Sequence, residues 1–443
     1  MPEKSKSYEK SAPRVYIRTF GCQMNFHDSE RIAGILRNEG YTLTEYPNSA
    51  DLIIINTCSV REKAEQKFYS ELGRFRRLRK KNPSLKIAVA GCIAQQEGVS
   101  ILKRFDHVDY LIGTRNIGKI QLMLEGKVTP LNIDDDPEYH LRTLPAVRSN
   151  RVSAWVSIMY GCDNFCSFCI VPYTRGRERS RDYRDICDEI KRLADEGYKE
   201  VTLLGQNVNS YGKGLEDDID FPGLLCLIND IDGIERIRFV TSHPRDLSER
   251  LIDAMEELPK VCEHIHLPIQ SGSDKILKLM NRGYNYSEYI ARIELLRKKI
   301  PDIAITTDII VGFPGETDND FMQTLKALKE IEFDGIFAFK YSKRPNTSAL
   351  KLPGHLQDEV KSERLEEVLV LQDDITSKIN RQMEGRVVEV LVEGPSKTDR
   401  DKLTGRTRTN KIVIFNNDKL LEGILVNTLI IKGNRHSLYG ILS

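Results

Sequence analysis

The sequence predicts an α/β protein: an N-terminal domain with a parallel sheet, a central partial (βα)6 barrel, and a small C-terminal β-barrel. Strand-like runs alternate with helical patterns up to residue 125 and again from 147 to about 376, as in parallel sheets with helical crossovers. The last part of the chain contains only short strand-like runs separated by Gly, Asn and Asp. The length of 443 residues suits about three domains.

The composition limits the possible functions. The 66 Lys and Arg nearly balance the 65 Asp and Glu, so the net charge does not indicate a polyanionic partner. No uncharged apolar run reaches the roughly 18 residues of a membrane span, and residues 1–14 lack the apolar segment of a secretory signal. We expect a soluble, cytoplasmic protein without a membrane partner. In a reducing compartment, its nine cysteines favour metal or redox use over structural disulfides.

The N-terminal elements follow a regular order. Strands are predicted at residues 15–20, 51–56, 86–90 and 110–112, with helices at 28–38, 60–80, 94–105 and 117–125. Residues 134–137, flanked by prolines, are typical of a linker. We therefore predict one domain over residues 14–130.

Three cysteines of this domain share one position relative to the strands. Cys22, Cys58 and Cys92 each lie just past the carboxyl end of a predicted strand. Ligands of open α/β sheets gather at that edge, so three loops would bring one thiolate each to a common point. The alternative, three unrelated buried thiols, remains open because long-range spacing carries less information than a local triplet.

The central region contains six predicted strands, at residues 152–159, 201–204, 236–241, 264–269, 303–311 and 335–339. Helices between them are predicted at 184–196, 247–258, 286–299 and 318–331, among others. Six βα units are too few to close an eight-fold barrel. We expect an open barrel with its site at the carboxyl ends of the strands.

A local cysteine triplet follows the first of these strands. Cys162, Cys166 and Cys169 have the spacing C-x3-C-x2-C on one loop. A structural zinc site needs four ligands, so three fit poorly unless a distant ligand joins, whereas an iron-sulfur cluster with one open iron fits well. The remaining alternative is a set of buried, unreactive thiols.

Polar and glycine-rich motifs lie at the ends of the other central strands. They occupy residues 205–207, 242–244, 270–273 and 311–317. Each by itself is more typical of a plain turn, but their shared position favours a cofactor, because glycines allow close backbone approach and helix starts offer free N–H groups.

The last stretch predicts five strands, at residues 387–392, 402–409, 411–415, 425–432 and 437–442. This pattern favours a small five-stranded barrel. Residues 380–443 contain 11 Lys and Arg against 7 Asp and Glu. Small basic barrels often bind nucleic acid, but this surplus is weak support.

Several motifs resemble known families. The triplet with Phe168 before its third cysteine resembles the radical S-adenosylmethionine (SAM) superfamily. The longer runs at residues 19–25 (TFGCQMN), 56–61 (NTCSVR) and 171–176 (VPYTRG) resemble the methylthiotransferase family of these enzymes. They are most similar to its tRNA-modifying branch, the 2-methylthio-(dimethylallyl)adenosine synthases.

The resemblance implies a domain plan and two clusters. The domains would be a methylthiotransferase N-terminal domain (14–130), a radical SAM core (147–377) and an RNA-binding TRAM domain (380–443). Cys162, Cys166 and Cys169 would hold a 4Fe-4S cluster that binds SAM, and Cys22, Cys58 and Cys92 an auxiliary 4Fe-4S cluster. The expected SAM contacts are Phe168, Gly205, Gln206, Asn207, Ser271, Gly312 and Glu316. Gly205-Gln206-Asn207 stands where the superfamily usually has Gly-Gly-Glu, and no side chain is assigned a catalytic role of its own.

The implied reaction uses two SAM molecules, one to methylate cluster-bound sulfur and one to give a 5′-deoxyadenosyl radical. That radical would act on C2 of dimethylallyl-adenosine beside the anticodon of tRNA. The implied enzyme is a monomer that needs the anticodon stem-loop, an electron donor such as flavodoxin or ferredoxin, and a sulfur source. Alternatives are the same chemistry on a ribosomal-protein aspartate or a threonylcarbamoyl adenosine, a non-catalytic iron-sulfur RNA-binding protein, and a multi-zinc protein.

Overall fold

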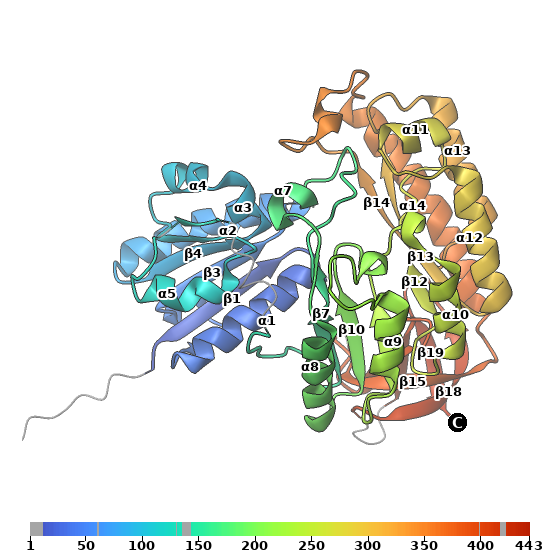
Figure 1. Cartoon of the computed structure of the whole chain (residues 1–443), viewed down its shortest axis with the longest axis horizontal. Helices are drawn as coiled ribbons and strands as arrows, with labels where there is room; N and C mark the ends of the chain where they lie inside the picture. Colours follow the sequence, from blue (N-terminus) through green and yellow to red (C-terminus); the bar gives the residue numbers. More distant parts are fainter. Residues whose placement is uncertain (1–11, 60–61, 130, 135–142, 398, 417–421) are drawn as a thin grey trace, which may run out of the picture. The chain divides into compact units, whose positions relative to one another are not determined.

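The structure is a computed structural model that describes residues 12–59, 62–129, 131–134, 143–397, 399–416 and 422–443 (Figure 1). Residues 135–137 of the predicted linker lie outside this part, as do residues 1–11 and residues 60–61 of a predicted helix. The chain divides into two compact units, with the boundary between Ser149 and Asn150. No helix in the described ranges combines the length and apolarity needed to cross a bilayer.

The first unit is built on a six-stranded parallel sheet with the order β2-β1-β3-β4-β5-β6. The strands are β1 (Arg14–Phe20), β2 (Thr42–Leu43), β3 (Leu52–Thr57), β4 (Lys86–Gly91), β5 (Tyr110–Ile112) and β6 (Leu131–Asn132). The sequence predicted only β1, β3, β4 and β5. The two-residue strands β2 and β6 are too short to produce a periodic pattern.

Helices cover both faces of this sheet. They are α1 (Gln23–Asn38), α2 (Glu62–Lys81), α3 (Cys92–Glu97), α4 (Val99–Arg104) and α5 (Ile120–Leu124). Ile53 and Ile55 pack toward α2, α3 and α4, whereas Leu52 and Ile54 pack toward α1 and α5, because alternate residues of a strand point to opposite faces. The single helix predicted at 94–105 is two helices, since Gly98 adopts a left-handed φ of +49° between them.

The second unit begins with six parallel strands, in the order β7-β10-β11 and β12-β13-β14. A bridge between Ile237 and Val261 joins the two sets into one open barrel wall. The strands are β7 (Ser153–Ser157), β10 (Glu200–Leu204), β11 (Arg236–Phe239), β12 (His264–His266), β13 (Ala304–Val311) and β14 (Gly335–Lys340). The predicted partial barrel of six βα units is confirmed.

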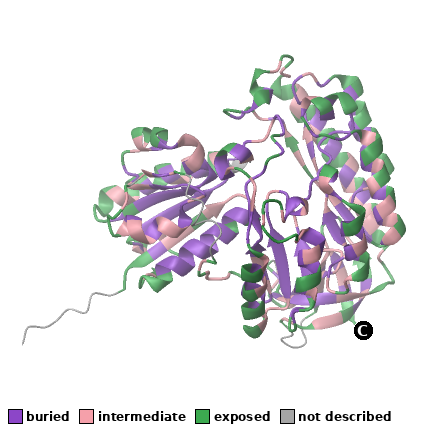
Figure 2. Ribbon diagram, viewed as in Figure 1, coloured by how far each residue is buried: buried purple, intermediate pink, exposed green. Residues whose placement is uncertain are grey.

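Amphipathic helices pack on the outside of this wall, with buried inner and exposed outer faces (Figure 2). They are α8 (Tyr183–Asp195), α9 (Phe221–Asn229), α10 (Glu249–Glu257), α11 (Asp274–Leu279), α12 (Tyr286–Lys299), α13 (Asp318–Ile331) and α14 (Asp358–Arg381). The sequence analysis did not predict α14, which has few buried side chains for its length and therefore a weak apolar pattern.

The strand predicted at 152–159 was too long. The chain leaves β7 after Ser157 and forms β8 (Met159–Tyr160), which pairs in antiparallel orientation with β9 (Arg179–Ser180). The cysteine triplet and the short helix α7 (Val171–Arg175) lie between β8 and β9. This small ladder therefore closes the base of the cluster loop.

The C-terminal segment forms a closed five-stranded barrel with the order β15-β16-β17-β19-β18, as predicted. Its strands are β15 (Val387–Pro395), β16 (Lys402–Thr407), β17 (Ile412–Asn416), β18 (Leu425–Gly433) and β19 (Leu438–Leu442). Its core is aliphatic apart from Phe415, with Val390, Val392, Leu403 and Val413 at its centre.

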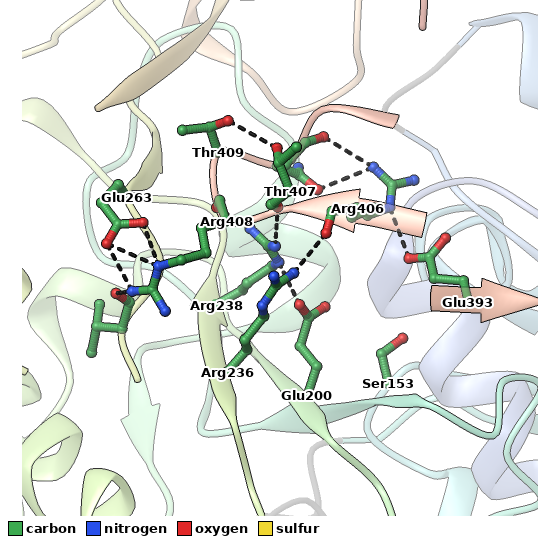
Figure 3. Close-up of polar contacts among 12 residues, drawn as sticks. Ser153, Glu200, Arg236, Arg238, Glu263, Glu393, Arg406, Thr407, Arg408 and Thr409 are labelled. Carbon is green, nitrogen blue, oxygen red and sulfur yellow. Dashed lines mark hydrogen bonds and ion pairs between the residues drawn. The ribbon is translucent and has the colours of Figure 1, made fainter. Parts of the chain in front are cut away.

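Buried arginines fix this barrel to the amino-terminal ends of the central strands (Figure 3). Arg236 of β11 donates to the Arg406 carbonyl (2.7 Å) and the Glu389 carboxylate (2.8 Å). Arg238 donates to the carbonyls of Thr407 and Arg408, both at 2.7 Å. The small barrel therefore lies at the end of the strands opposite their carboxyl edge.

Candidate functional site

The first candidate site is the carboxyl edge of the N-terminal sheet. Cys22 follows β1, Cys58 follows β3 and Cys92 opens α3 directly after β4. The order β2-β1-β3 reverses direction between β1 and β3, and such a switch point leaves a crevice where ligands of open α/β sheets bind. The topology therefore delivers Cys22 and Cys58 to the two sides of that crevice.

The Cys58 thiol contacts the thiols of both Cys22 and Cys92. Hydrogen bonds with Cys22 and then with Cys92, followed by burial, raise the pKa of the Cys58 thiol well above its usual range. Cys58 and Cys92 are buried. In the described part of the chain, no three His, Cys, Asp or Glu side chains are grouped as one metal ion would require. The contacts nevertheless show that three separate loops bring these sulfurs together.

Two glycines permit this close approach. Gly21 has a φ of +142°, and a Cβ there would lie 2.6 Å from Cys58 Cβ. Gly91 has a φ of +90°, and its Cβ would meet Asn56 Oδ1 at 2.3 Å and the Thr57 carbonyl at 2.7 Å. Both positions combine a left-handed conformation with too little space for a side chain.

A buried amide network that the sequence analysis did not single out supports the same loops. Asn25 accepts a bond from Cys22 Sγ (3.3 Å), and Asn56 donates to the Asn25 carbonyl (2.8 Å) and to Ser29 Oγ (2.9 Å). Both asparagines are fully buried. The sequence did contain a signal for these asparagines, because they lie next to Cys22 and Cys58 in the motifs 19–25 and 56–61.

The second candidate site is the loop with Cys162, Cys166 and Cys169. Burial raises the pKa of Cys162 to about 11 and that of Cys169 to about 12. Gln206, which follows β10, accepts a hydrogen bond from the backbone N–H of Gly161, next to the first cysteine. The side-chain oxygen of Gln206 thus supports the cluster loop, and its expected contact with SAM stays a prediction.

Buried polar atoms without a partner line the carboxyl edge of the partial barrel. Within the described residues, these atoms include Asn207 Oδ1 after β10, Ser242 Oγ and His243 Nε2 after β11, and Gln270 Oε1 after β12. Buried polar groups normally have a partner, so such a group of atoms indicates a place for a polar ligand. This observation fits SAM, whose amino, carboxylate and ribose groups need several such contacts.

His243 is a neutral donor in this group. Burial, followed by the charges of Arg282 and Arg245, lowers the pKa of His243 to about 2. Its Nδ1 accepts the backbone N–H of Arg245 at 3.3 Å, so Nε2 carries the proton. The sequence analysis gave this histidine no role of its own. The signal was its place in the motif 242–244 at a strand end.

Two residues at this edge have strained backbones. Thr241 has a φ of +67° and Gln270 a φ of +74°, in the left-handed region that residues other than glycine seldom adopt and the β-branched Thr241 least readily. Thr241 Oγ1 donates to the carbonyl of Gly205 at 2.7 Å, which ties the ends of β10 and β11 together. Strain of this kind is common where a fold positions a ligand.

The remaining expected SAM contacts fall into different settings. Phe168 packs against a small core that includes Phe313 and Tyr341. Gly205 lies directly after β10, and Asn207 donates to Asp246 Oδ2 (2.7 Å).

Ser271 is fully buried. Its hydroxyl oxygen accepts a hydrogen bond from the backbone N–H of Ser273 (3.2 Å) and forms a second hydrogen bond with Thr324 Oγ1 (3.3 Å). Its hydroxyl therefore organises the start of α11.

Glu316 closes the turn that follows β13. Its Oε2 accepts the backbone N–H of Gly312 (2.7 Å), where φ is +70°, and also the guanidinium of Arg364 from α14. Burial raises the pKa of Glu316 even though these two donors oppose the effect. The carboxylate thus holds the shape of the turn, and the expected contact of Gly312 and Glu316 with SAM stays a prediction.

An exposed aromatic pair also lies on the cluster loop. Phe165 is 40% exposed and Tyr173 is 44% exposed, and their rings meet edge to face with centroids 6.3 Å apart. The Arg177 guanidinium lies 5.6 Å from the Phe165 ring centroid. Phe165 has a φ of +44°, and Asn281 Nδ2 donates to its carbonyl (3.1 Å). Packing of the protein core does not explain why the Phe165 side chain faces solvent with a strained backbone.

Comparison with known proteins agrees with this geometry. Residues 14–113 match the uncharacterized protein family UPF0004, residues 156–328 the radical SAM superfamily, and residues 381–442 the TRAM domain. A protein of Thermodesulfovibrio yellowstonii named tRNA-2-methylthio-N(6)-dimethylallyladenosine synthase is 56% identical over 96% of this chain and 98% of its own length. The chain belongs to this family of radical SAM enzymes. A protein of the same name from Clostridium novyi is 51% identical over 96% of each chain.

Solved structures share the fold at low sequence identity. The radical SAM methyltransferase TsrM of Kitasatospora setae is 15% identical, with a TM-score of 0.56 over 76% of this chain and 77% of its own. The cobalamin-dependent radical SAM enzyme OxsB gives 0.51 over 82% of this chain and 56% of its own, at 13% identity. The predicted fold class and family are confirmed.

Proposed function

We propose that this chain methylthiolates C2 of dimethylallyl-adenosine next to the anticodon of tRNA. The chain has two sites of three cysteines each. It is also 56% identical, over 96% of its length, to an enzyme named for this product, and these two observations together carry the proposal. The assigned domains are an auxiliary-cluster domain at 14–130, the radical SAM core at 147–377 and the RNA-binding TRAM domain at 380–443. No membrane partner enters this scheme, and we place the monomeric enzyme in the cytoplasm.

The donor sets fit two 4Fe-4S clusters. Each site supplies three thiols, which leaves one iron free for a further ligand. When bound, the clusters and SAM would supply a 5′-deoxyadenosyl radical at Cys162, Cys166 and Cys169, and sulfur with a methyl group at Cys22, Cys58 and Cys92. Neighbouring thiols and burial raise the pKa of Cys58, and burial raises that of Cys162, so cluster binding at these sites would release protons.

The chain's own residues orient the cofactor and exclude water. Asn207, His243 and Gln270 offer two acceptors and one donor in a buried setting at the carboxyl edge. The backbone of Gly312 and the ring of Phe168 border the same strand ends. Gly205 and Gln206 connect the end of β10 to β11 and to the cluster loop. We assign SAM to this edge.

Recognition of RNA rests on more than positive charge. In the C-terminal barrel, Arg406 pairs with Glu393 (3.0 Å), and Arg408 and Lys411 pair with carboxylates of the core (2.7 Å each). The Arg406–Glu393 pair lies within the barrel, and Arg408 and Lys411 direct two further positive charges to carboxylates outside it, so these three cations are already paired. The exposed rings of Phe165 and Tyr173, with Arg177, suit unpaired bases of a single-stranded loop, which proteins bind by stacking.

The test is anaerobic turnover of the reconstituted full-length protein with SAM and a reductant. We expect a methylthio mass gain on dimethylallylated tRNA, and none on tRNA with threonylcarbamoyl adenosine or on a ribosomal protein with an acceptor aspartate. A chain with Cys162, Cys166 and Cys169 all changed to Ala should lose activity and about four irons. Turnover on a different acceptor would contradict the proposal. An electron donor such as flavodoxin or ferredoxin and a sulfur source complete the expected partners.

A further inference from the structure

Arg282 is a buried arginine with an unusual set of contacts. It lies between α11 and α12 and is 4% exposed. Its Nη1 donates to Cys166 Sγ at 3.2 Å, its Nη2 to the Pro268 carbonyl at 2.8 Å, and its Nε to Tyr284 Oη at 3.1 Å. One guanidinium thus joins a cysteine of the cluster loop to the end of β12.

The charge of Arg282 has no carboxylate partner within the described part of the chain. Arginine stays protonated in proteins, and a buried charge without a counter-ion is strongly unfavourable. The neighbouring ionisable groups that favour its charge are Tyr284 and Cys166. His243 is neutral, and burial raises the pKa of Tyr284, so the phenol is neutral as well. Three groups accept hydrogen bonds from the Arg282 guanidinium, and of these only Cys166 Sγ belongs to the cluster loop.

We propose that Arg282 is a positioning residue that holds Cys166 and raises the reduction potential of the cluster bound by Cys162, Cys166 and Cys169. The inference rests on the proposed function, which places a cluster there. Hydrogen bonds to cluster sulfurs and nearby positive charge favour the reduced, more negative form. Arg282 supplies both, and its charge is independent of pH near neutrality.

Neighbouring groups fix the direction of the Arg282 donors. Tyr284 Oη accepts from Nε and donates to the Ile269 carbonyl at 2.9 Å. The Pro268 carbonyl occupies Nη2, so Nη1 is directed at Cys166. A lysine could bring the charge but not this planar fork, since its ammonium is a point charge on a flexible stem.

The test measures the potential directly, in the full-length chain with Cys22, Cys58 and Cys92 changed to Ala so that one cluster remains. After anaerobic reconstitution, iron and sulfide per chain are counted, and the midpoint potential is determined by redox titration monitored by electron paramagnetic resonance. Arg282→Gln should keep about four irons and have a more negative midpoint than the parent. Arg282→Lys should give a midpoint between the two.

Arg245→Gln is the matched control. Arg245 also lies near the cluster loop, where it donates to Asn164, but it pairs with Asp246 and makes no hydrogen bond to sulfur among the described residues. It should change the midpoint less than Arg282→Gln. A full cluster with the parent midpoint in Arg282→Gln would overturn the proposal and leave the proposed function intact. Loss of iron in both Arg282 variants would also overturn it, because Arg282 would then only support the loop. A parent without iron would refute the proposed function as well.

Discussion

Arg238 connects the partial barrel to the C-terminal barrel. Replacing it by Met should lower the free energy of unfolding by about 4 kcal/mol. Arg238 is 5% exposed and donates from Nε to Glu200 Oε2 at 2.8 Å. The variant leaves the Glu200 carboxylate buried and unpaired, which typically costs about 3–5 kcal/mol. The carbonyls of Thr407 and Arg408 also lose their donor, which overlaps with this cost.

The chain has a built-in reporter for this measurement. Its single tryptophan, Trp155, lies in β7 and pairs with Thr202 of β10, the strand that begins with Glu200. Urea unfolding followed by tryptophan fluorescence therefore reports on the barrel wall to which Arg238 is bonded. Limited proteolysis should show the C-terminal barrel becoming cleavable at lower urea concentration than in the parent.

Two further variants test the reasoning. Arg250→Met removes the exposed ion pair with Asp220 and should cost at most about 1 kcal/mol. Combining Arg238→Met with Glu200→Gln should recover part of the loss, since no buried charge is left unpaired. A loss below about 1 kcal/mol for Arg238→Met, or a double variant no more stable than the single one, would refute the argument.

Three other predictions concern the sites. Gly21→Ala should remove about four irons per chain while leaving the Cys162 cluster in place, because the new Cβ would displace Cys58; unchanged iron would contradict this. Burial alone would raise the pKa of Asp320, but hydrogen bonds from Lys275, Thr317 and Ser273 lower it below its usual value. Its contribution to stability is therefore complete above the unfolded pKa near 3.8 and lost as pH falls below it, so Asp320→Asn should flatten the acid limb of thermal unfolding measured against pH. Phe165→Ala combined with Tyr173→Ala should weaken binding of the anticodon stem-loop about tenfold or more, measured by fluorescence anisotropy of a labelled stem-loop. Iron content should stay at the parent value. An unchanged affinity would show that these rings are not part of the RNA-binding surface.

Much of the fold follows from local patterns. Strand alternation and helical periodicity predicted the parallel sheets, the six βα units and the five-stranded barrel, because burial of one face imposes a period on the sequence. The elements that the sequence analysis missed or misplaced also have physical explanations. The edge strands β2 and β6 are too short to show a period, α14 has a weak apolar stripe, and Gly98 divides one predicted helix in two.

The candidate sites were predictable in part. The local spacing of Cys162, Cys166 and Cys169 predicted one site by itself, whereas the convergence of Cys22, Cys58 and Cys92 required the assumption of a parallel sheet, which the structure bears out. The expected cofactor contacts depend on side-chain direction. The structure turns Gln206 and Glu316 toward protein groups, and no sequence pattern reveals such a choice.

The sequence by itself determined where the chain turns and which residues follow each strand, because strand length, glycine positions and cysteine spacing are local properties. Only the tertiary structure decided which distant groups meet. Arg282 and Cys166 are separated by 116 positions, and Arg238 and Thr407 by 169. Their contacts depend on sheet register, barrel closure and the balance of buried charge, which no stretch of sequence contains.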